Sequence, residues 1–277
     1  MNKLCFLFLF LFLSQFAFAQ KYGGDSWATV KSKGSGKLAV VFYAQNGLIV
    51  EEGGKMKGLC VDLLNDFVQY VQTKYGKKIN IDYQGEEKAY EKFLRIPQTT
   101  PNLLGVSSVT VTEERKKIMK FTPPFLFNQI VLITHKDAPT IDNIKNIGSV
   151  LKGYSAKVMG GSVFLTYIEQ IKKEHMPSLP ISTGSNSDDI INEVCNNPKL
   201  FTLIDLTQYI DANRKKLPIK MQNVKIGPDQ ERAFSMSKQS DWDEIWNEFL
   251  TPEYRKSEKY RQFIVSNLGG TYFRVFK

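Results

Sequence analysis

The chain has 277 residues, of which 42% are hydrophobic and 23% charged, with two His and three Cys. These proportions are close to globular averages and exclude a disordered, fibrous or disulfide-rich chain. The length suits one large domain or two lobes of roughly 100 to 150 residues each. Because the few His and Cys residues show no Cys-x-x-Cys or His-x-x-x-His spacing, we predict neither a metal site nor a cofactor.

The first twenty residues have the pattern of a secretory signal peptide. Lys3 precedes an apolar run over 4–13, and a small-x-small triplet at 17–19 stands before Gln20. The run is shorter than the ~20 apolar residues needed to span a bilayer. We therefore predict that residues 1–19 are removed and that a secreted mature protein begins near Gln20.

Charge and cysteine content limit the partners of the mature chain. Loss of the leader leaves 36 basic and 28 acidic residues, because that segment contains one lysine and no acid. Such a surplus is compatible with nucleic-acid binding. The basic residues are scattered near acids, however, without an arginine-rich stripe, so we predict a solvated surface and no nucleic-acid partner. Cys60 and Cys195 lie in separate apolar stretches, which favours two buried free thiols, although an oxidising compartment also permits one disulfide.

The first half of the chain alternates between patterns typical of strands and of helices. Residues 21–36 are rich in Gly, Ser and Lys and predict an irregular leader. The elements expected after it are a strand at 37–43, a helix within 53–76, a strand at 77–83, a helix at 86–95 that ends before Pro97, and a strand at 103–111. This order predicts an α/β lobe with helices against a largely parallel sheet.

The second half repeats this organisation and predicts a second lobe. The expected elements are strands at 127–135, 155–160 and 200–206, helices at 160–174 and from Ser187 onward, an apolar helical stripe over 242–250, and a helix at 257–267. Trp242 and Trp246 lie on the apolar stripe and are predicted to be core residues.

Three segments resemble motifs of a known family, the extracytoplasmic solute-binding proteins of amino-acid ABC transporters. Residues 53–64 resemble its Gly-x-x-x-Gly-hydrophobic-x-x-Asp-Leu segment. Residues 107–125 resemble its Ser-x-Thr-x-Thr-x-x-Arg block with the Phe-x-x-Pro-aromatic run, and 151–170 resemble its Leu-Lys-Gly, strand, Gly-Ser, helix unit. The Thr-x-x-Arg block is the most specific of these, and the motif order covers essentially the whole mature chain.

The resemblance implies the type II periplasmic-binding fold, an α/β fold with two lobes, two crossover strands and a ligand cleft between the lobes. Lobe 1 would consist of 20–128 plus 239–277, and lobe 2 of 129–238. The implied function is capture of a small amino-acid-like ligand in the periplasm by hinge closure. A monomer without catalytic activity would then deliver this ligand to a membrane ABC permease.

The resemblance also implies a binding site for a free amino acid. A cleft that excludes water must replace the hydration of the ligand's carboxylate and ammonium with matched hydrogen bonds. Arg115 would take the carboxylate through its planar guanidinium, and Asp205 would take the ammonium. Further contacts would come from Ser108 and Thr110 on the preceding strand, Ser162 and Val163 at the start of a helix that favours an anion, and Tyr43.

Other interpretations of these residues stay open. Arg115 lies in a charged run and could be a solvated helix residue. Asp205 and Ser162 could serve only as helix caps, and Tyr43 could be a core or rim residue.

Two other classes of protein also stay open. A dehydratase-like enzyme on the same fold would need an acid and a base over its substrate, and Glu113 or Glu114 are the candidates. The third possibility is a ligand-sensing module for a membrane receptor.

Overall fold

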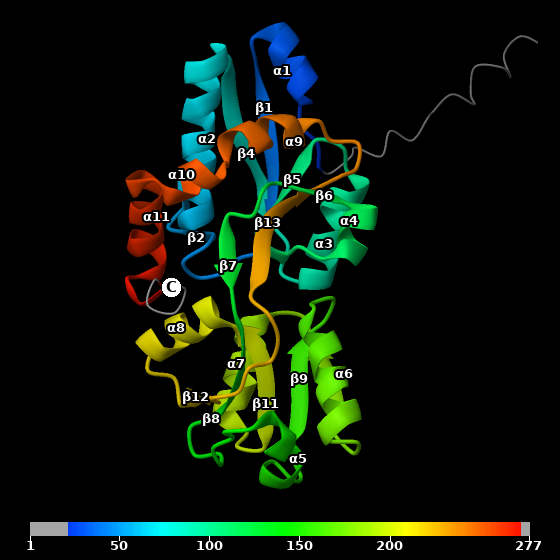
Figure 1. Ribbon diagram of the computed structural model, residues 1–277. Coiled ribbons are helices and arrows are strands. Elements are labelled where there is room, and N and C mark those ends of the chain that lie inside the picture. Colours follow the sequence, from blue (N-terminus) through cyan, green and yellow to red (C-terminus); the bar gives the residue numbers. More distant parts are fainter. Residues whose placement is uncertain (1–21, 273–277) are drawn as a thin grey trace, which may run out of the picture.

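The structure is a computed structural model that describes residues 22–272, in which two sheets form the centres of two lobes (Figure 1). The predicted signal peptide, residues 1–19, lies outside the described residues. In Figure 1 lobe 1 lies at the top, around β1, β5 and β13, and lobe 2 lies below, around β8, β9 and β11. No helix within 22–272 combines the length and apolar character needed to cross a membrane.

The sheet of lobe 1 combines strands from both ends of the chain. Its order is β4-β1-β5-β13-β6, with β7 also paired to β13. The bounds are Ser35–Phe42 (β1), Lys78–Glu86 (β4), Leu103–Thr110 (β5), Lys120–Phe121 (β6), Leu126–Asn128 (β7) and Gln230–Met236 (β13). Strand β1 is parallel to β4 and β5, whereas β13 is antiparallel to β5. The sheet is therefore mixed.

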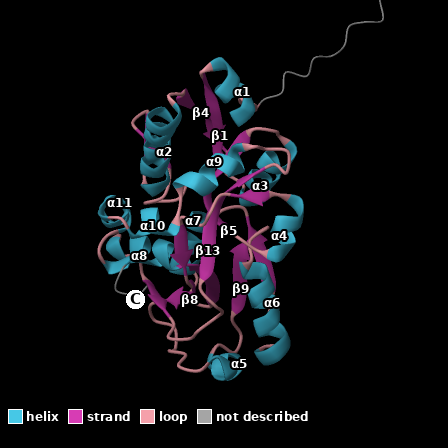
Figure 2. Ribbon diagram, turned by 45° about the horizontal axis from the view of Figure 1, so that its top comes forward, coloured by secondary structure: helices cyan, strands magenta, loops and turns pink. Residues whose placement is uncertain are grey.

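Helices cover both faces of this sheet (Figure 2). Alternate residues of a strand point to opposite faces, and in β1 Leu38 and Val40 face the cluster built on α2, while Ala39 and Val41 face the one that contains α3. The helices are α1 (Trp27–Lys33), α2 (Leu59–Tyr75), α3 (Tyr90–Thr99), α4 (Glu113–Ile118), α9 (Trp242–Phe249), α10 (Pro252–Lys256) and α11 (Glu258–Leu268); β2 (Val50–Glu52) and β3 (Lys55–Lys57) form a small hairpin.

Lobe 2 has the sheet order β10-β9-β11-β8-β12. The strands are β8 (Ile130–His135), β9 (Ser155–Met159), β10 (Ile181–Gly184), β11 (Leu200–Asp205) and β12 (Ile219–Met221). The helices are η1 (Ile144–Asn146), α5 (Ile147–Val150), α6 (Phe164–His175), α7 (Ser187–Asn196) and α8 (Leu206–Arg214). Strands β10, β9 and β11 are parallel, and β8 is antiparallel to β11, so this sheet too is mixed.

The chain passes between the lobes twice, from β7 to β8 and from β12 to β13 (Figure 1). The second passage lies earlier than the expected division at 238, because β13 pairs with β5 and β7 in lobe 1. Phe234 and Met236 on β13 are buried in the core of that lobe, which explains why the strand belongs there.

Two local expectations were wrong. Residues 27–33 form helix α1 instead of a leader, because Ser26 caps its first turn and Trp27 is buried. Helix α3 does not end before Pro97 but continues to Thr99. The Pro97 ring is buried against β5, where Gly105 makes room for it, and this packing offsets the hydrogen bond that proline cannot donate.

The tryptophans share the core of lobe 1 with Cys60, whereas Cys195 lies in lobe 2. Trp246 is fully buried and stacks on Phe67 with ring centroids 4.0 Å apart, which confirms the prediction of a core role for the apolar stripe. Cys60 is buried in lobe 1, and Cys195 is half-buried in lobe 2. Both are free thiols, so the structure has the unpaired arrangement that the sequence favoured.

Gly58 provides a test of the fold. It precedes α2 with φ of 119° and ψ of 170°, a region that is essentially restricted to glycine, and a Cβ there would lie 2.4 Å from the Leu48 carbonyl oxygen. We expect Gly58→Ala to lower the free energy of unfolding by at least about 3 kcal/mol, measured by urea denaturation. Gly54→Ala is the control, because Gly54 also has positive φ but open space around it, and its cost should be about 1 to 2 kcal/mol. Equal costs would contradict this account.

Candidate functional site

The predicted site residues gather where strands of the two lobes end facing each other. Thr110 ends β5 in lobe 1, and Asp205 ends β11 in lobe 2. The Ser108 hydroxyl on β5 lies 3.4 Å from an Asp205 carboxylate oxygen, which places the two strands in contact across the junction. Ligands of open α/β sheets bind outside the carboxyl ends of strands, so this junction is the candidate cleft.

Arg115 reaches across the cleft from lobe 1. Thr112 caps α4 by accepting a hydrogen bond from the Arg115 backbone N–H, which fixes the first turn of this short helix. The Arg115 guanidinium donates to the Thr110 carbonyl at 2.8 Å and to the Gly161 carbonyl of lobe 2 at 2.9 Å. Arg115 is buried, which excludes the interpretation of a solvated helix residue.

Asp205 is already paired with an arginine that the sequence analysis did not select. Arg232 on β13 donates to the Asp205 carboxylate and to the Thr110 hydroxyl. The side chains of Arg232 and Asp205 are only 1% and 7% exposed. Burial raises the pKa of the Asp205 carboxyl, and the Arg232 charge together with hydrogen bonds from Arg232, Ser108 and Gln45 opposes that rise. Asp205 is also the N-cap residue of α8, so the same residue caps a helix and forms the ion pair.

Tyr43 closes the junction on the side of α7. Its hydroxyl accepts a hydrogen bond from the Ser187 backbone N–H at 3.1 Å and lies 3.4 Å from the Met159 sulfur, both in lobe 2. The ring packs edge-on against Tyr90, with centroids 5.2 Å apart. Burial raises the pKa of the Tyr43 phenol, so the group stays protonated at neutral pH. Tyr43 is therefore a core residue that bridges the lobes, in keeping with the alternative interpretation.

Ser162 and Val163 lie beside Arg115 but differ from expectation. The Ser162 hydroxyl donates to the Met159 carbonyl at 2.5 Å and so closes the turn after β9. The N-cap residue of α6 is Val163, without a side-chain hydrogen bond, because the helix begins only at Phe164. The contact to Arg115 comes instead from the backbone carbonyl of Gly161.

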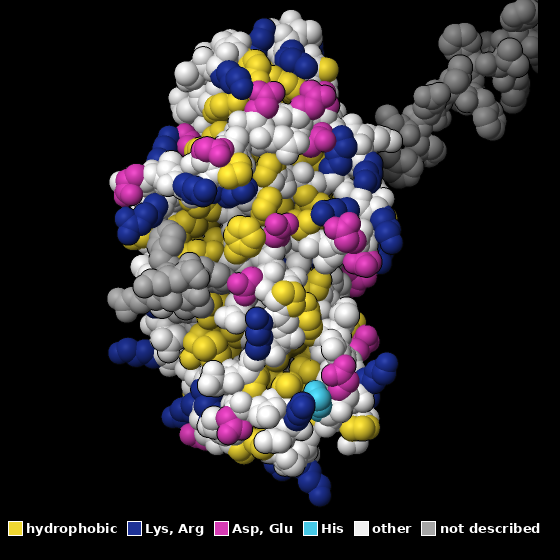
Figure 3. Space-filling view, in the orientation of Figure 1, with side chains coloured by type: hydrophobic (Ala, Val, Ile, Leu, Met, Phe, Trp, Pro, Cys, Tyr) yellow, Lys and Arg dark blue, Asp and Glu magenta, His cyan; other side chains and the backbone are white. Residues whose placement is uncertain are grey.

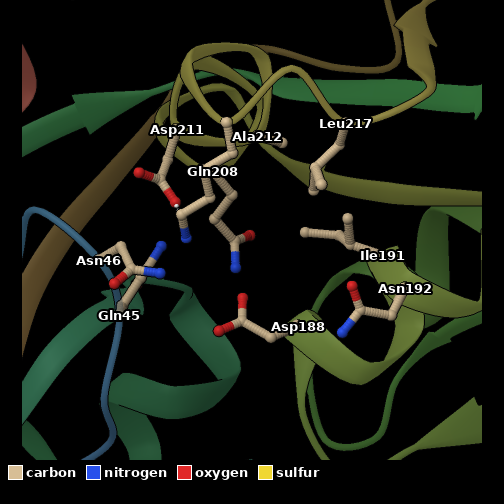
Figure 4. Close-up of a pocket in the computed structure, with 10 residues that line it drawn as sticks. Gln45, Asn46, Asp188, Ile191, Asn192, Gln208, Asp211, Ala212 and Leu217 are labelled. Carbon is tan, nitrogen blue, oxygen red and sulfur yellow. Dashed lines mark ion pairs between the residues drawn. The ribbon is translucent and has the colours of Figure 1, made fainter. Parts of the chain in front are cut away.

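A cavity of about 170 Å³ borders the cleft on its α7 and α8 side (Figure 4). Gln45 and Asn46 line it from the loop after β1, while Asp188 on α7 and Gln208 and Asp211 on α8 line it from lobe 2. This volume is below the 300–1,000 Å³ typical of sites for drug-sized ligands, so it suits only a small molecule or part of one. Within residues 22–272 no group of three or more His, Cys, Asp or Glu is placed to hold a metal ion.

The residues that sequence reasoning missed are Arg232, Gln45, Gln208 and Ser187. Arg232 directly precedes the apolar pair Ala233-Phe234, but charged residues are mostly exposed, so this position alone does not predict its burial. The Gln208 amide donates to the Ser187 hydroxyl at 2.5 Å, and no local pattern marks either residue for this contact. The two acids of the dehydratase alternative, Glu113 and Glu114, are exposed.

The comparisons with known proteins establish the fold. No family model matches the chain. The arginine-, lysine- and histidine-binding protein ArtJ from Geobacillus stearothermophilus is 18% identical, with a TM-score of 0.68 over 87% of this chain and 100% of that chain. An ancestral arginine-binding protein bound to arginine is 18% identical, with a TM-score of 0.66 over 84% and 98%. The ancestral amino-acid-binding protein AncCDT-1, a precursor of cyclohexadienyl dehydratase, is 18% identical, with a TM-score of 0.64 over 87% and 98%.

These likenesses confirm the predicted class: the chain has the two-lobe α/β fold of periplasmic binding proteins. A putative binding component of an ABC transporter from Wolinella succinogenes, complexed with lysine, is also similar, at 14% identity and a TM-score of 0.68 over 86% of this chain and 98% of that chain.

The buried ion pair makes a prediction for stability. Arg232→Met leaves the Asp205 carboxylate buried without its partner, so we expect a loss of about 3 to 5 kcal/mol in the free energy of unfolding, measured by urea denaturation. The double variant Arg232→Met/Asp205→Asn should recover part of that loss, because the uncompensated charge is gone.

Arg95→Met is the matched control. Arg95 pairs with Glu91 on the exposed surface of α3, so this variant should cost less than about 1 kcal/mol. Similar costs for Arg232→Met and Arg95→Met would contradict a buried, mutually dependent pair.

Proposed function

We propose that this protein binds a small amino acid or a related carboxylate between its lobes and closes over it, without catalysing a reaction. The observation that carries the proposal is the position of Arg115. A buried guanidinium that spans from Thr110 in lobe 1 to Gly161 in lobe 2 offers a carboxylate a site that both lobes complete. Ligand binding would then favour closure, because the closed form provides more contacts.

The proposal extends to location and partners. The signal-peptide pattern at 1–19 supports secretion into the periplasm, and the likeness to a putative binding component of an ABC transporter supports delivery to a membrane ABC permease. The protein would act as a monomer. On the face shown in Figure 3, Lys and Arg side chains are interspersed with Asp and Glu. Such a mixed surface does not favour binding of nucleic acid.

A broad binding screen tests the proposal. Thermal unfolding of the ligand-free chain from Gln20 onward is measured against single amino acids and small carboxylic acids. A ligand at a hundred times its dissociation constant stabilises the folded state by about 2.7 kcal/mol, which raises the midpoint by roughly 5 to 10 °C. We expect such a shift for one or a few compounds and its loss in Arg115→Ala.

Arg95→Ala is the control for this screen, because Arg95 is exposed and pairs with Glu91 on α3 instead of with a residue of the cleft. It should retain the full shift. Equal shifts in wild type and Arg115→Ala would contradict the role of Arg115, and the absence of any shift would contradict solute binding.

A further inference from the structure

The buried charges of the cleft do not suit a zwitterion. The cleft contains two guanidinium groups, Arg115 and Arg232, and one carboxylate, Asp205. Arg232 neutralises Asp205 within the protein. Arg115 donates only to neutral carbonyls and forms no ion pair with any residue in 22–272. One positive charge is therefore left uncompensated, and a ligand of net charge −1 would balance it.

The hydrogen-bonding capacity of Asp205 is also in use. Its carboxylate accepts from Arg232 and lies within hydrogen-bond distance of the Ser108 hydroxyl. In the ion pair the unsatisfied buried group is a donor, the Arg232 Nε–H. Within the ion pair, therefore, the free hydrogen-bonding group is a donor, which suits an anion better than an ammonium.

Arg232 is held in place by the fold. It lies opposite Thr110 in the register of β13 and β5, and it donates to the Thr110 hydroxyl as well as to Asp205. Its side chain is 1% exposed, so movement of Arg232 away from Asp205 would leave a buried charge without a partner. A ligand ammonium that approached Asp205 would meet the like charge of Arg232.

No other carboxylate of the neighbouring cavity replaces Asp205. Asp211 is paired with Lys215 at 2.7 Å, and Asp188, whose carboxyl has its pKa raised chiefly by burial, makes no hydrogen bond to Arg115 or Arg232 within residues 22–272. Neither carboxylate takes part in the hydrogen bonds that join Arg115, Thr110, Asp205 and Arg232, so neither replaces Asp205 within that set of contacts.

We propose that the cleft selects a carboxylic acid that lacks an α-ammonium group, with Arg232 occupying on Asp205 the place that this ammonium would take. The inference rests on the proposed function, in which Arg115 holds the ligand carboxylate. It names the class of that ligand as 2-oxo, 2-hydroxy or unsubstituted acids of net charge −1 and makes Arg232 the residue that determines specificity.

Matched pairs of compounds test the inference. Isothermal titration calorimetry compares neutral amino acids, among them alanine, valine, leucine and methionine, each with its 2-oxo and 2-hydroxy analogue, on the chain from Gln20 onward. In a matched set that contains a ligand, we expect the acid without ammonium to bind at least about tenfold more tightly than the corresponding amino acid. In Arg232→Ala the preference should reverse, since Asp205 is then free to accept an ammonium.

The outcomes separate this inference from the proposed function. Tighter binding of an amino acid than of its analogues by the wild type would overturn the inference and leave solute binding intact. Binding of neither class would overturn both. Arg232→Ala leaves a buried carboxylate unpaired and could fail to fold. The affinities of the wild type for an amino acid and for its analogues therefore test the inference without the variant. An unchanged preference in a folded Arg232→Ala would overturn the role of Arg232.

Discussion

The buried ion pair between Arg232 and Asp205 is the interaction on which the arrangement of the cleft depends. It joins a strand of lobe 1 to the end of a strand of lobe 2, and both side chains are almost completely removed from water. The attraction between the two buried charges offsets the desolvation penalty, which is several kcal/mol for either charge alone. Their pairing therefore couples the position of one lobe to that of the other.

Other contacts near this ion pair also join the two lobes. Arg115 on one side and Tyr43 on the other each join a group of lobe 1 to the backbone of lobe 2. One hydrophobic cluster also contains side chains of both lobes, among them Tyr90 and Phe164. Separation of the lobes would expose these surfaces and charges, so opening and closing must exchange protein contacts for contacts with water or ligand.

Much of the fold was predictable because local patterns carry it. The alternation of strands and helices, the core role of Trp246 and the burial of β11 all follow from periodicity within short segments. The family resemblance supplied the two-lobe architecture, which periodicity alone does not give. Helix α1 was missed because its single buried apolar face is short, although Ser26 and Gly34 mark its two ends.

The site was less predictable because its contacts join distant parts of the chain. Arg115, Ser108, Thr110 and Asp205 do meet at one junction, but the partner of Asp205 is on β13. The register of β13 against β5 decides that contact, and no local spacing reveals it. The helix-cap alternative for Ser162 was wrong for a different reason, since its hydroxyl closes the turn after β9 before the helix begins.

A crystal structure of the protein with its tightest small-acid ligand would test the central claim most directly. The account predicts the ligand carboxylate on the Arg115 guanidinium, contacts from both lobes, and the Arg232 guanidinium still bound to Asp205. A ligand ammonium on Asp205 with Arg232 displaced, or a ligand bound outside the cleft, would contradict it.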